Sequence, residues 1–221
     1  MLVSDRILDF YKSLAPPSKL PKEVETLNPY QTADGWQSTS QFYKKYYADN
    51  HPRRMLFGIN PGRFGGGITG VPFTDPLLLE QVCDIQNPFH KRAELSSRFI
   101  YEMIAAYGGA EQFYSKFYIT GMSPLGFVMN GKNLNYYDLP NWQKIFEKDM
   151  IVWIKEQLTF SIDTSVAFSI GQGQNLKFLQ KINDQHHFFE QIVPVPHPRW
   201  VMQYRLKRKQ EFIDEYMHKL A

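Results

Sequence analysis

The segment from Met55 to Phe73 constrains the fold of this chain more than any other. A short apolar run ends at Asn60, and a glycine-rich loop follows that closes on Pro72 and Phe73. This pattern predicts a buried parallel strand that delivers the Asn60 side chain at its carboxyl end, where such sheets bind ligands. Glycines let backbone N–H groups approach a ligand, and the prolines keep the loop from becoming helix. The segment therefore predicts a small, pre-formed pocket.

Two nucleotide-binding motifs explain this loop poorly. A phosphate loop requires Gly-Lys-Ser/Thr after the glycines, and that sequence is absent. Gly65, Gly67 and Gly70 match the spacing of the dinucleotide fingerprint, but Pro72 stands where its helix would begin. A glycine-rich surface turn is the remaining alternative. Phe73 argues against it, because a surface turn has no need of an apolar ring just beyond the loop.

Predicted strands and helices alternate along the chain. We expect strands at residues 53–59, 117–120, 165–170 and 188–195, and helices at residues 1–14, 93–107, 142–158 and 201–220. This alternation predicts a parallel sheet with helices on both faces. A chain of 221 residues is long enough to bury one core. We therefore expect one domain over residues 1–221, with a helical N-terminal extension over 1–27 and a C-terminal helix over 199–221.

Composition limits the class of protein. The chain has 43% apolar and 21% charged residues, as in globular proteins. Its net charge of +3 means that any DNA affinity must come from a local patch. Cys83 is the single cysteine, which excludes internal disulfides and a cysteine-ligated iron–sulfur cluster, and the histidines lack metal-ligand spacing. We expect no metal, no cofactor, no membrane binding and, with no signal peptide, a soluble cytoplasmic protein.

Two further segments have the charge or ring content of nucleic-acid-binding surfaces. Residues 204–209 carry four cations in the first half of the predicted last helix, where cations oppose the helix dipole. They either contact phosphates or form a solvated face. Residues 42–47 alternate rings and lysines, as single-strand binding surfaces do. We favour the alternative that a helix buries these rings in the core, because aromatic side chains are mostly buried.

Three motifs occur in order along the chain. The first is Gly-Ile-Asn-Pro-Gly-Arg-Phe-Gly at residues 58–65, with Thr-Gly-Val-Pro-Phe at residues 69–73. Ser-Pro-Leu at residues 123–125 and Gly-Lys-Asn-Leu at residues 131–134 follow, and Val-Pro-His-Pro-Arg at residues 195–199 comes last. In order and spacing they resemble the motifs of the single-strand-selective monofunctional uracil-DNA glycosylases, a branch of the uracil-DNA glycosylase superfamily.

The resemblance spans residues 28–205 and carries expectations about fold and activity. It implies a three-layer α/β/α fold with a central four-stranded parallel sheet. It also implies a monofunctional enzyme that excises uracil and modified uracils, including hydroxymethyluracil, from single- and double-stranded DNA and leaves an abasic site. We expect a monomer that needs no cofactor.

Residue types suggest how such a site breaks a glycosidic bond. The Asn60 amide oxygen is suited to hold a water at the sugar, because an oxocarbenium-like carbon needs positioning more than base strength. His197 is suited to donate a hydrogen bond to the base carbonyl as charge develops there. A buried histidine in a proline turn is the structural alternative for His197.

The remaining candidates contact the base or the DNA. Phe73 is suited to stack on a flipped base, and the glycine backbone to fit its edge. The expected base-binding residues are Ile59, Gly62, Arg63, Phe64, Gly65, Phe73, Gly121, Ser123 and Asn133. The expected DNA-binding residues are Pro198, Arg199, Trp200, Val201, Arg205, Lys207 and Arg208, of which Arg199, Trp200 or Val201 would fill the gap in the base stack.

Two departures from the family pattern suggest a divergent branch. Gly121 stands where the family has an Asn that reads the uracil edge, so backbone, Ser123, Asn130 or Asn133 must take over that role. Pro198 also meets Arg199 directly, without the two intervening residues typical of the family. We expect broader or altered base choice. A non-catalytic DNA-binding relative and a nucleotide- or nucleoside-binding enzyme with the same pocket remain alternatives.

Overall fold

A four-stranded parallel sheet forms the centre of the computed structural model, which describes residues 1–221. Its strands are β2 (Arg53–Gly58), β3 (Phe117–Gly121), β6 (Ile162–Ile170) and β7 (Gln191–Val195), in the order β3-β2-β6-β7. The apolar run of β2 is fully buried because both faces of the sheet are covered, which explains why it reads as continuous and not alternating. The predicted four-stranded parallel sheet is confirmed.

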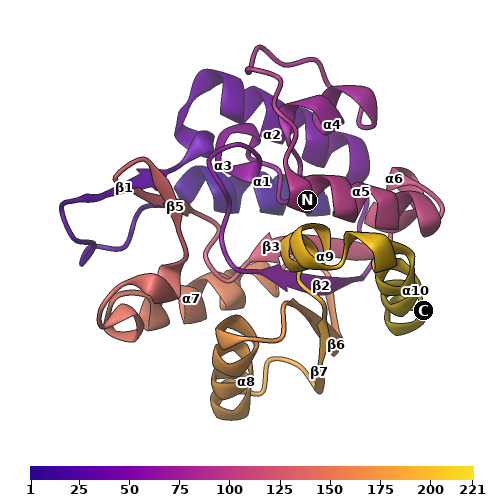
Figure 1. The fold of residues 1–221 in the computed structure, drawn as a ribbon. Coiled ribbons are helices and arrows are strands. Elements are labelled where there is room, and N and C mark those ends of the chain that lie inside the picture. The colour runs from indigo at the N-terminus through magenta and orange to yellow at the C-terminus, as the bar shows by residue number, and fades with distance from the viewer.

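Helices cover both faces of this sheet (Figure 1). On one face α5 (Leu95–Ala106) packs against α9 (Pro198–Tyr204) and α10 (Lys209–Leu220). On the other lie α7 (Trp142–Gln157) and α8 (Gln174–His186), joined by an ion pair of 3.0 Å between Lys181 and Glu147. The predicted three-layer arrangement is therefore confirmed. Shorter elements connect the layers, namely η1 (Pro29–Gln31), α3 (Gly66–Thr69), α4 (Pro76–Gln81), α6 (Ala110–Tyr114), η2 (Tyr136–Asp138) and η3 (Leu206–Arg208).

Two N-terminal helices, α1 (Val3–Ser13) and α2 (Ala33–Tyr46), pack along the β3 edge of the sheet. The Tyr11 hydroxyl lies 3.1 Å from that of Tyr118 on β3, and the Tyr47 hydroxyl donates to the Phe117 carbonyl at 3.0 Å. The rings of residues 42–47 are buried, so the core interpretation of that segment is correct. A helical extension over 1–27 is wrong in part: the predicted N-terminal helix is present as α1, but it belongs to the core, and residues 24–27 form a strand.

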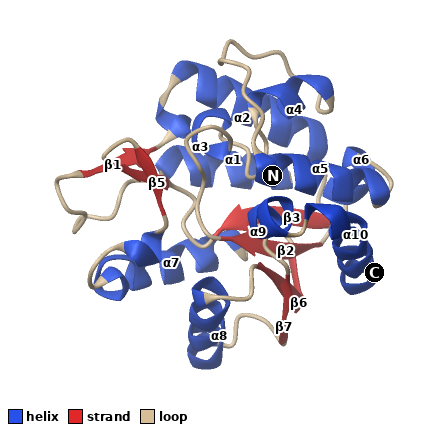
Figure 2. Ribbon diagram, in the orientation of Figure 1, coloured by secondary structure: helices blue, strands red, loops and turns tan.

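That strand, β1 (Val24–Leu27), belongs to a small antiparallel sheet that the sequence did not predict. It pairs with β4 (Gly126–Met129), which pairs in turn with β5 (Lys132–Leu134). Figure 2 shows β1 and β5 beside the parallel sheet, close to the loop that carries α3. Strands of three and four residues are too short to show a periodic pattern.

The predicted C-terminal helix over 199–221 is also wrong, because two helices occupy this region. The chain leaves α9 at Arg205 (φ −134°, ψ 22°), makes the turn η3 and continues as α10. Val201 on α9 and Tyr216 on α10 are both buried, and the bend lets both helices turn their apolar faces inward. The basic segment 204–209 therefore lies at the junction between α9 and α10. Arg205 caps the C-terminus of α9, where its positive charge interacts favourably with the helix dipole.

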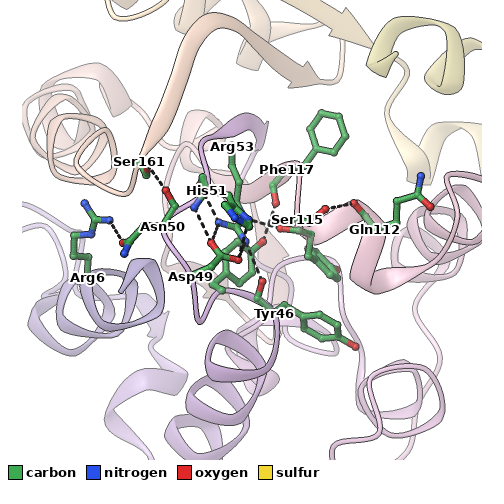
Figure 3. Close-up of polar contacts among 12 residues, drawn as sticks. Arg6, Tyr46, Asp49, Asn50, His51, Arg53, Gln112, Ser115, Phe117 and Ser161 are labelled. Carbon is green, nitrogen blue, oxygen red and sulfur yellow. Dashed lines mark hydrogen bonds and ion pairs between the residues drawn. The ribbon is translucent and has the colours of Figure 1, made fainter. Parts of the chain in front are cut away.

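One buried cation ties the sheet to α2 and α6. The Arg53 side chain is 0% exposed, and its guanidinium donates to both Asp49 carboxylate oxygens at 2.8 Å (Figure 3). It also donates to the backbone carbonyls of Tyr46 at 3.1 Å and Tyr114 at 2.6 Å. These hydrogen bonds hold the pKa of the Asp49 carboxyl below its usual value.

We predict that Asp49→Asn lowers the free energy of unfolding at pH 7 by about 3 kcal/mol, since it leaves the buried Arg53 charge without its counter-ion. The lowered pKa means that the stabilisation is complete above the unfolded-state value of about 4 and is lost as the pH falls through the folded-state pKa. Urea unfolding at pH 7 and pH 3 measures both. Glu147→Gln removes a surface pair and should cost less than about 1 kcal/mol. Equal losses in the two variants would contradict the prediction.

Candidate active site

A cavity of about 690 Å³ opens at the carboxyl ends of the parallel strands. Gly58 and Gly121 line it where β2 and β3 end, and Gly171 and Pro196 line it just beyond β6 and β7. Ligands in open parallel sheets bind at this edge, so the cavity is the candidate site.

Phe73 lines this cavity next to the end of β2. A Cβ added at Gly58 would come within 2.8 Å of its ring, so only glycine leaves room for it. Phe73 has φ 51°, a strained conformation for a non-glycine residue. A hydrogen bond beside Phe73, in which the Thr69 hydroxyl donates to the Thr74 carbonyl at 2.8 Å, stabilises this strained backbone. The ring is thus fixed before any ligand arrives.

Asn60 lines the cavity two residues beyond β2, as predicted from the end of the apolar run. Its Oδ1 accepts the Tyr136 N–H at 3.0 Å, and its Nδ2 donates to the Leu134 carbonyl at 3.1 Å. The side chain therefore anchors the segment that follows β5. An amide oxygen has two lone pairs, so one of them stays available on Oδ1.

His197 caps the N-terminus of α9 and also lines the cavity. Its Nδ1 accepts the Arg199 N–H at 3.2 Å, and this hydrogen bond assigns the proton of the neutral ring to Nε2. Burial and, secondarily, the Arg199 charge lower the pKa of His197 to about 4. The ring packs over Gly171, at 3.5 Å from where a Cβ would stand. At neutral pH His197 is thus an uncharged donor held in one tautomer.

The cavity brings together only part of the predicted base-binding set. Ile59, Gly62, Phe73, Gly121 and Asn133 line it.

Arg63, Phe64, Gly65 and Ser123 do not line the cavity, so this structure gives no support to a direct base contact for them. The Phe64 ring lies between two guanidinium groups, with Arg63 at 4.5 Å and Arg92 at 3.7 Å from its centroid. The Ser123 hydroxyl is buried and donates to the Leu125 carbonyl at 2.8 Å. Gly65 packs against the Glu94 carboxyl.

The backbone around Gly121 leaves no room for an Asn side chain. A Cβ at this position would lie 3.2 Å from the Ile59 carbonyl and collide with the Ser123 carbonyl. Of the predicted replacements, Asn130 is exposed in the turn after β4, whereas Asn133 lines the cavity. The Asn133 Oδ1 accepts the Arg63 N–H at 3.0 Å, so its Nδ2 is free to act as a donor.

Sequence reasoning missed several polar residues of the cavity, among them Asn175 and Glu94. Asn175, at the start of α8, donates to the Gly58 carbonyl at 3.2 Å and accepts from the Tyr136 hydroxyl at 2.9 Å. Glu94, just before α5, lines the cavity as a carboxyl group whose pKa is raised by burial. No motif marks either residue, and their contacts join segments that are distant in the chain.

The predicted DNA-binding residues differ in how accessible they are. Pro198 and Val201 are buried residues of α9, so neither side chain is exposed for contact with DNA. Trp200 is 41% exposed at the cavity rim, with the Arg205 guanidinium 5.0 Å from its ring centroid. Lys207 is exposed, and Arg208 donates to Glu211 at 2.6 Å.

Two classes of feature are absent from the described chain. No group of three or more His, Cys, Asp or Glu side chains is arranged to hold a metal ion. None of the helices has both the length and the apolar character needed to cross a membrane.

Comparison with known proteins identifies the family. The family model described as the uracil DNA glycosylase superfamily matches residues 44–221. The chain belongs to this superfamily. The crystal structure of wild-type SMUG2 from Pedobacter heparinus is similar to it, with a TM-score of 0.95 and 44% sequence identity over 99% of this chain and 97% of that one. No curated protein matches the chain.

The resemblance predicted from the three motifs is therefore confirmed, as is the fold class. Membership in the superfamily makes the protein a DNA glycosylase, a DNA repair hydrolase whose substrate is DNA. The roles of individual residues, the preferred base and the strand preference remain predictions.

Proposed function

We propose that this DNA glycosylase hydrolyses the N-glycosidic bond of uracil and modified uracils such as hydroxymethyluracil, and releases the base without cutting the strand. The observation that carries the proposal is the shared cavity of Asn60, Phe73 and a neutral His197 at the strand ends. No lysine lines this cavity, so no amine is in place to form a Schiff base with the sugar. That absence supports a monofunctional enzyme that leaves an abasic site.

The geometry supports a division of roles around a flipped base. The base stacks on the fixed Phe73 ring, with its edge against the Gly58 and Gly121 backbone. The Nε2–H of His197 donates to the base carbonyl, where negative charge grows as the bond breaks. The free lone pair of Asn60 Oδ1 holds the attacking water. A carbon with oxocarbenium character reacts readily with a water that is positioned in this way.

Base choice is expected to be broader than in relatives with an Asn at the position of Gly121. The backbone N–H groups of Met122 and Ser123 already donate to the Gly58 and Ile59 carbonyls, at 2.9 and 3.1 Å. We assign the missing donor to Asn133 Nδ2, which lies 3.2 Å from where a Gly62 Cβ would stand. Asn133 lies on the short strand β5 and its Oδ1 already accepts the Arg63 N–H, so it offers the base one donor where an Asn at position 121 would offer a donor and an acceptor.

Exposed cations at and beside the cavity rim support binding to the DNA backbone. Arg199 lines the cavity from α9, and Arg205 and Lys207 are exposed at the junction that follows this helix. Single- and double-stranded DNA both offer phosphates to such a rim, and the exposed Trp200 ring offers a stacking surface in place of the shortened second motif. The protein is proposed to act as a monomer.

One assay separates this function from its alternatives. Oligonucleotides with uracil, hydroxymethyluracil, hypoxanthine or xanthine, single- or double-stranded, are incubated with the protein and treated with alkali. Alkali-labile breaks at the modified base, without breaks before alkali, support a monofunctional glycosylase. Binding without excision would indicate a non-catalytic relative. Thermal stabilisation by free nucleotides in the absence of excision would indicate a nucleotide-binding enzyme.

We predict that Asn60→Ala lowers the single-turnover excision rate at least tenfold, equivalent to at least about 1.4 kcal/mol of transition-state stabilisation. Binding to DNA with an abasic-site analogue should persist. The variant also loses the Asn60 hydrogen bonds to the Leu134 carbonyl and the Tyr136 N–H. Tyr136→Phe keeps both of these bonds and loses only the hydroxyl bond to Asn175, so it serves as a control for disturbed packing at this position. A wild-type rate in Asn60→Ala would remove Asn60 from the mechanism.

His197→Ala should reduce the excision rate about 100-fold, a common cost of losing one donor to a developing oxyanion. The loss should be smaller for fluorouracil, because a better leaving group depends less on the donor. Affinity for abasic product DNA should change little. If uracil and fluorouracil lose the same factor, His197 only shapes the pocket.

Replacing Arg205 and Lys207 with Ala should weaken DNA binding for every sequence and reduce the slope of log K against log salt by about 2. Arg208→Ala is the matched control, because Arg208 already donates to Glu211. Its salt slope should stay unchanged. Fluorescence anisotropy over a series of salt concentrations measures both, and equal slopes for all three proteins would assign the basic junction to a solvated face.

A further inference from the structure

Glu94 is a cavity carboxyl group that the roles described above leave unused. Only one other acidic residue, Glu215, lines the cavity, and Lys219 neutralises it at 2.6 Å. Glu94 has no ion pair with any Lys, Arg or His of the chain. A carboxyl group that is partly buried without a cation is costly, so its presence in the site calls for a function.

The Glu94 side chain is held on one side only. The Ser97 hydroxyl donates to its Oε2 at 3.1 Å, and the Glu94 backbone N–H donates to Asp75 at 2.8 Å. No hydrogen bond reaches Oε1. A Cβ added at Gly62 would lie 2.9 Å from Oε1, and one at Gly65 would collide with Oε2. The glycines of the first motif therefore make room for this carboxyl, not only for a ligand.

The order of residues along the loop indicates which part of the substrate Glu94 meets. Gly58 and Phe73 line the part of the cavity where the base is proposed to stack. The chain continues through Asn60, which is proposed to hold the attacking water, to Gly62, against which Oε1 lies. Glu94 Oε1 therefore faces the loop two residues beyond Asn60, in the same cavity as the proposed water.

We propose that Glu94 is the catalytic base that takes the proton of the attacking water, a role that rests on the glycosylase function proposed above. The C1′–N bond breaks and its electron pair leaves with the base, which His197 stabilises. The water oxygen bonds to C1′, and the water proton passes to the Glu94 carboxylate. Asn60 orients the water, so the two residues divide positioning from proton transfer.

The surroundings of Glu94 suit this role. Burial raises the pKa of its carboxyl, and the nearby Asp75 carboxylate adds to that rise. The Arg199 guanidinium acts in the opposite direction, and His197 is neutral. A carboxylate becomes a stronger base as its pKa approaches the working pH. The carboxylate is nevertheless the form that accepts a proton, so activity should rise with pH through the raised pKa.

The test compares wild-type protein with Glu94→Gln and Glu94→Asp in single-turnover excision from pH 4.5 to pH 9. Gln keeps the shape and the hydrogen bond from Ser97 but cannot take a proton. We expect Glu94→Gln to be slower by about 100-fold at pH 8 and to lose the rise with pH. The deficit should shrink toward low pH, where the wild-type carboxyl is protonated. Glu94→Asp should keep the rise at a reduced rate.

Three controls separate this role from a structural one. Glu102→Gln alters a carboxylate on α5, the helix that Glu94 precedes. Glu102 pairs with Arg98 and Lys209 outside the cavity, so the pH profile of this variant should match wild type. Melting temperatures and affinity for abasic DNA show whether Glu94→Gln is folded and binds. A folded Glu94→Gln variant with the wild-type rate or pH profile overturns the assignment of Glu94 alone. A wild-type protein that excises no base overturns the proposed function and this role together.

Discussion

Two carbonyl groups at the end of β2, those of Gly58 and Ile59, hold the candidate site together. The Met122 N–H and the Asn175 side chain both donate to Gly58, at 2.9 and 3.2 Å, and the Ser123 N–H donates to Ile59 at 3.1 Å. These bonds join the loops that follow β3 and β6 to the central strand. They also account for the glycine at 121, where the backbone segments approach too closely for a Cβ, whereas Gly58 leaves room for the Phe73 ring. The cavity thus exists because several chain segments satisfy one strand end.

Burial shifts the pKa values of two ionisable groups in the cavity, Glu94 and His197, in opposite directions. It raises the pKa of Glu94 and lowers that of His197, so each group is pushed toward its neutral form. For His197 this yields a neutral donor, and for Glu94 a carboxyl that titrates closer to neutral pH. Shifts of this kind assign acid and base roles in many enzymes without a metal or cofactor. The proposed mechanism needs only this environment and a well-placed water.

The sequence identified residues at the ends of strands better than residues on loops. Asn60 and His197 line the cavity as expected, because a strand carries its next residues to a known edge of the sheet. The sequence predicts base contacts for Arg63 and Phe64, yet the loop turns after Gly62 so that the Phe64 ring lies between the guanidinium groups of Arg63 and Arg92. Pro198 and Val201 were assigned to DNA, but α9 buries them. Which way a loop or short helix faces depends on its partners, and local sequence does not encode them.

The sequence by itself determined the parallel sheet, the alternation of strands and helices, and the motifs that identify the superfamily. These properties follow from hydrophobic periodicity and from residue types at strand ends, which are local. Tertiary structure alone decided that Glu94 and Asn175 join the cavity, that β1, β4 and β5 pair, and that the C-terminal helix bends at Arg205. Glu94 lies 32 residues from Gly62 in the chain, yet its carboxyl contacts the Gly62 loop only once α5 has packed against the sheet. Contacts of that kind arise from long-range packing, and no local sequence pattern predicts them.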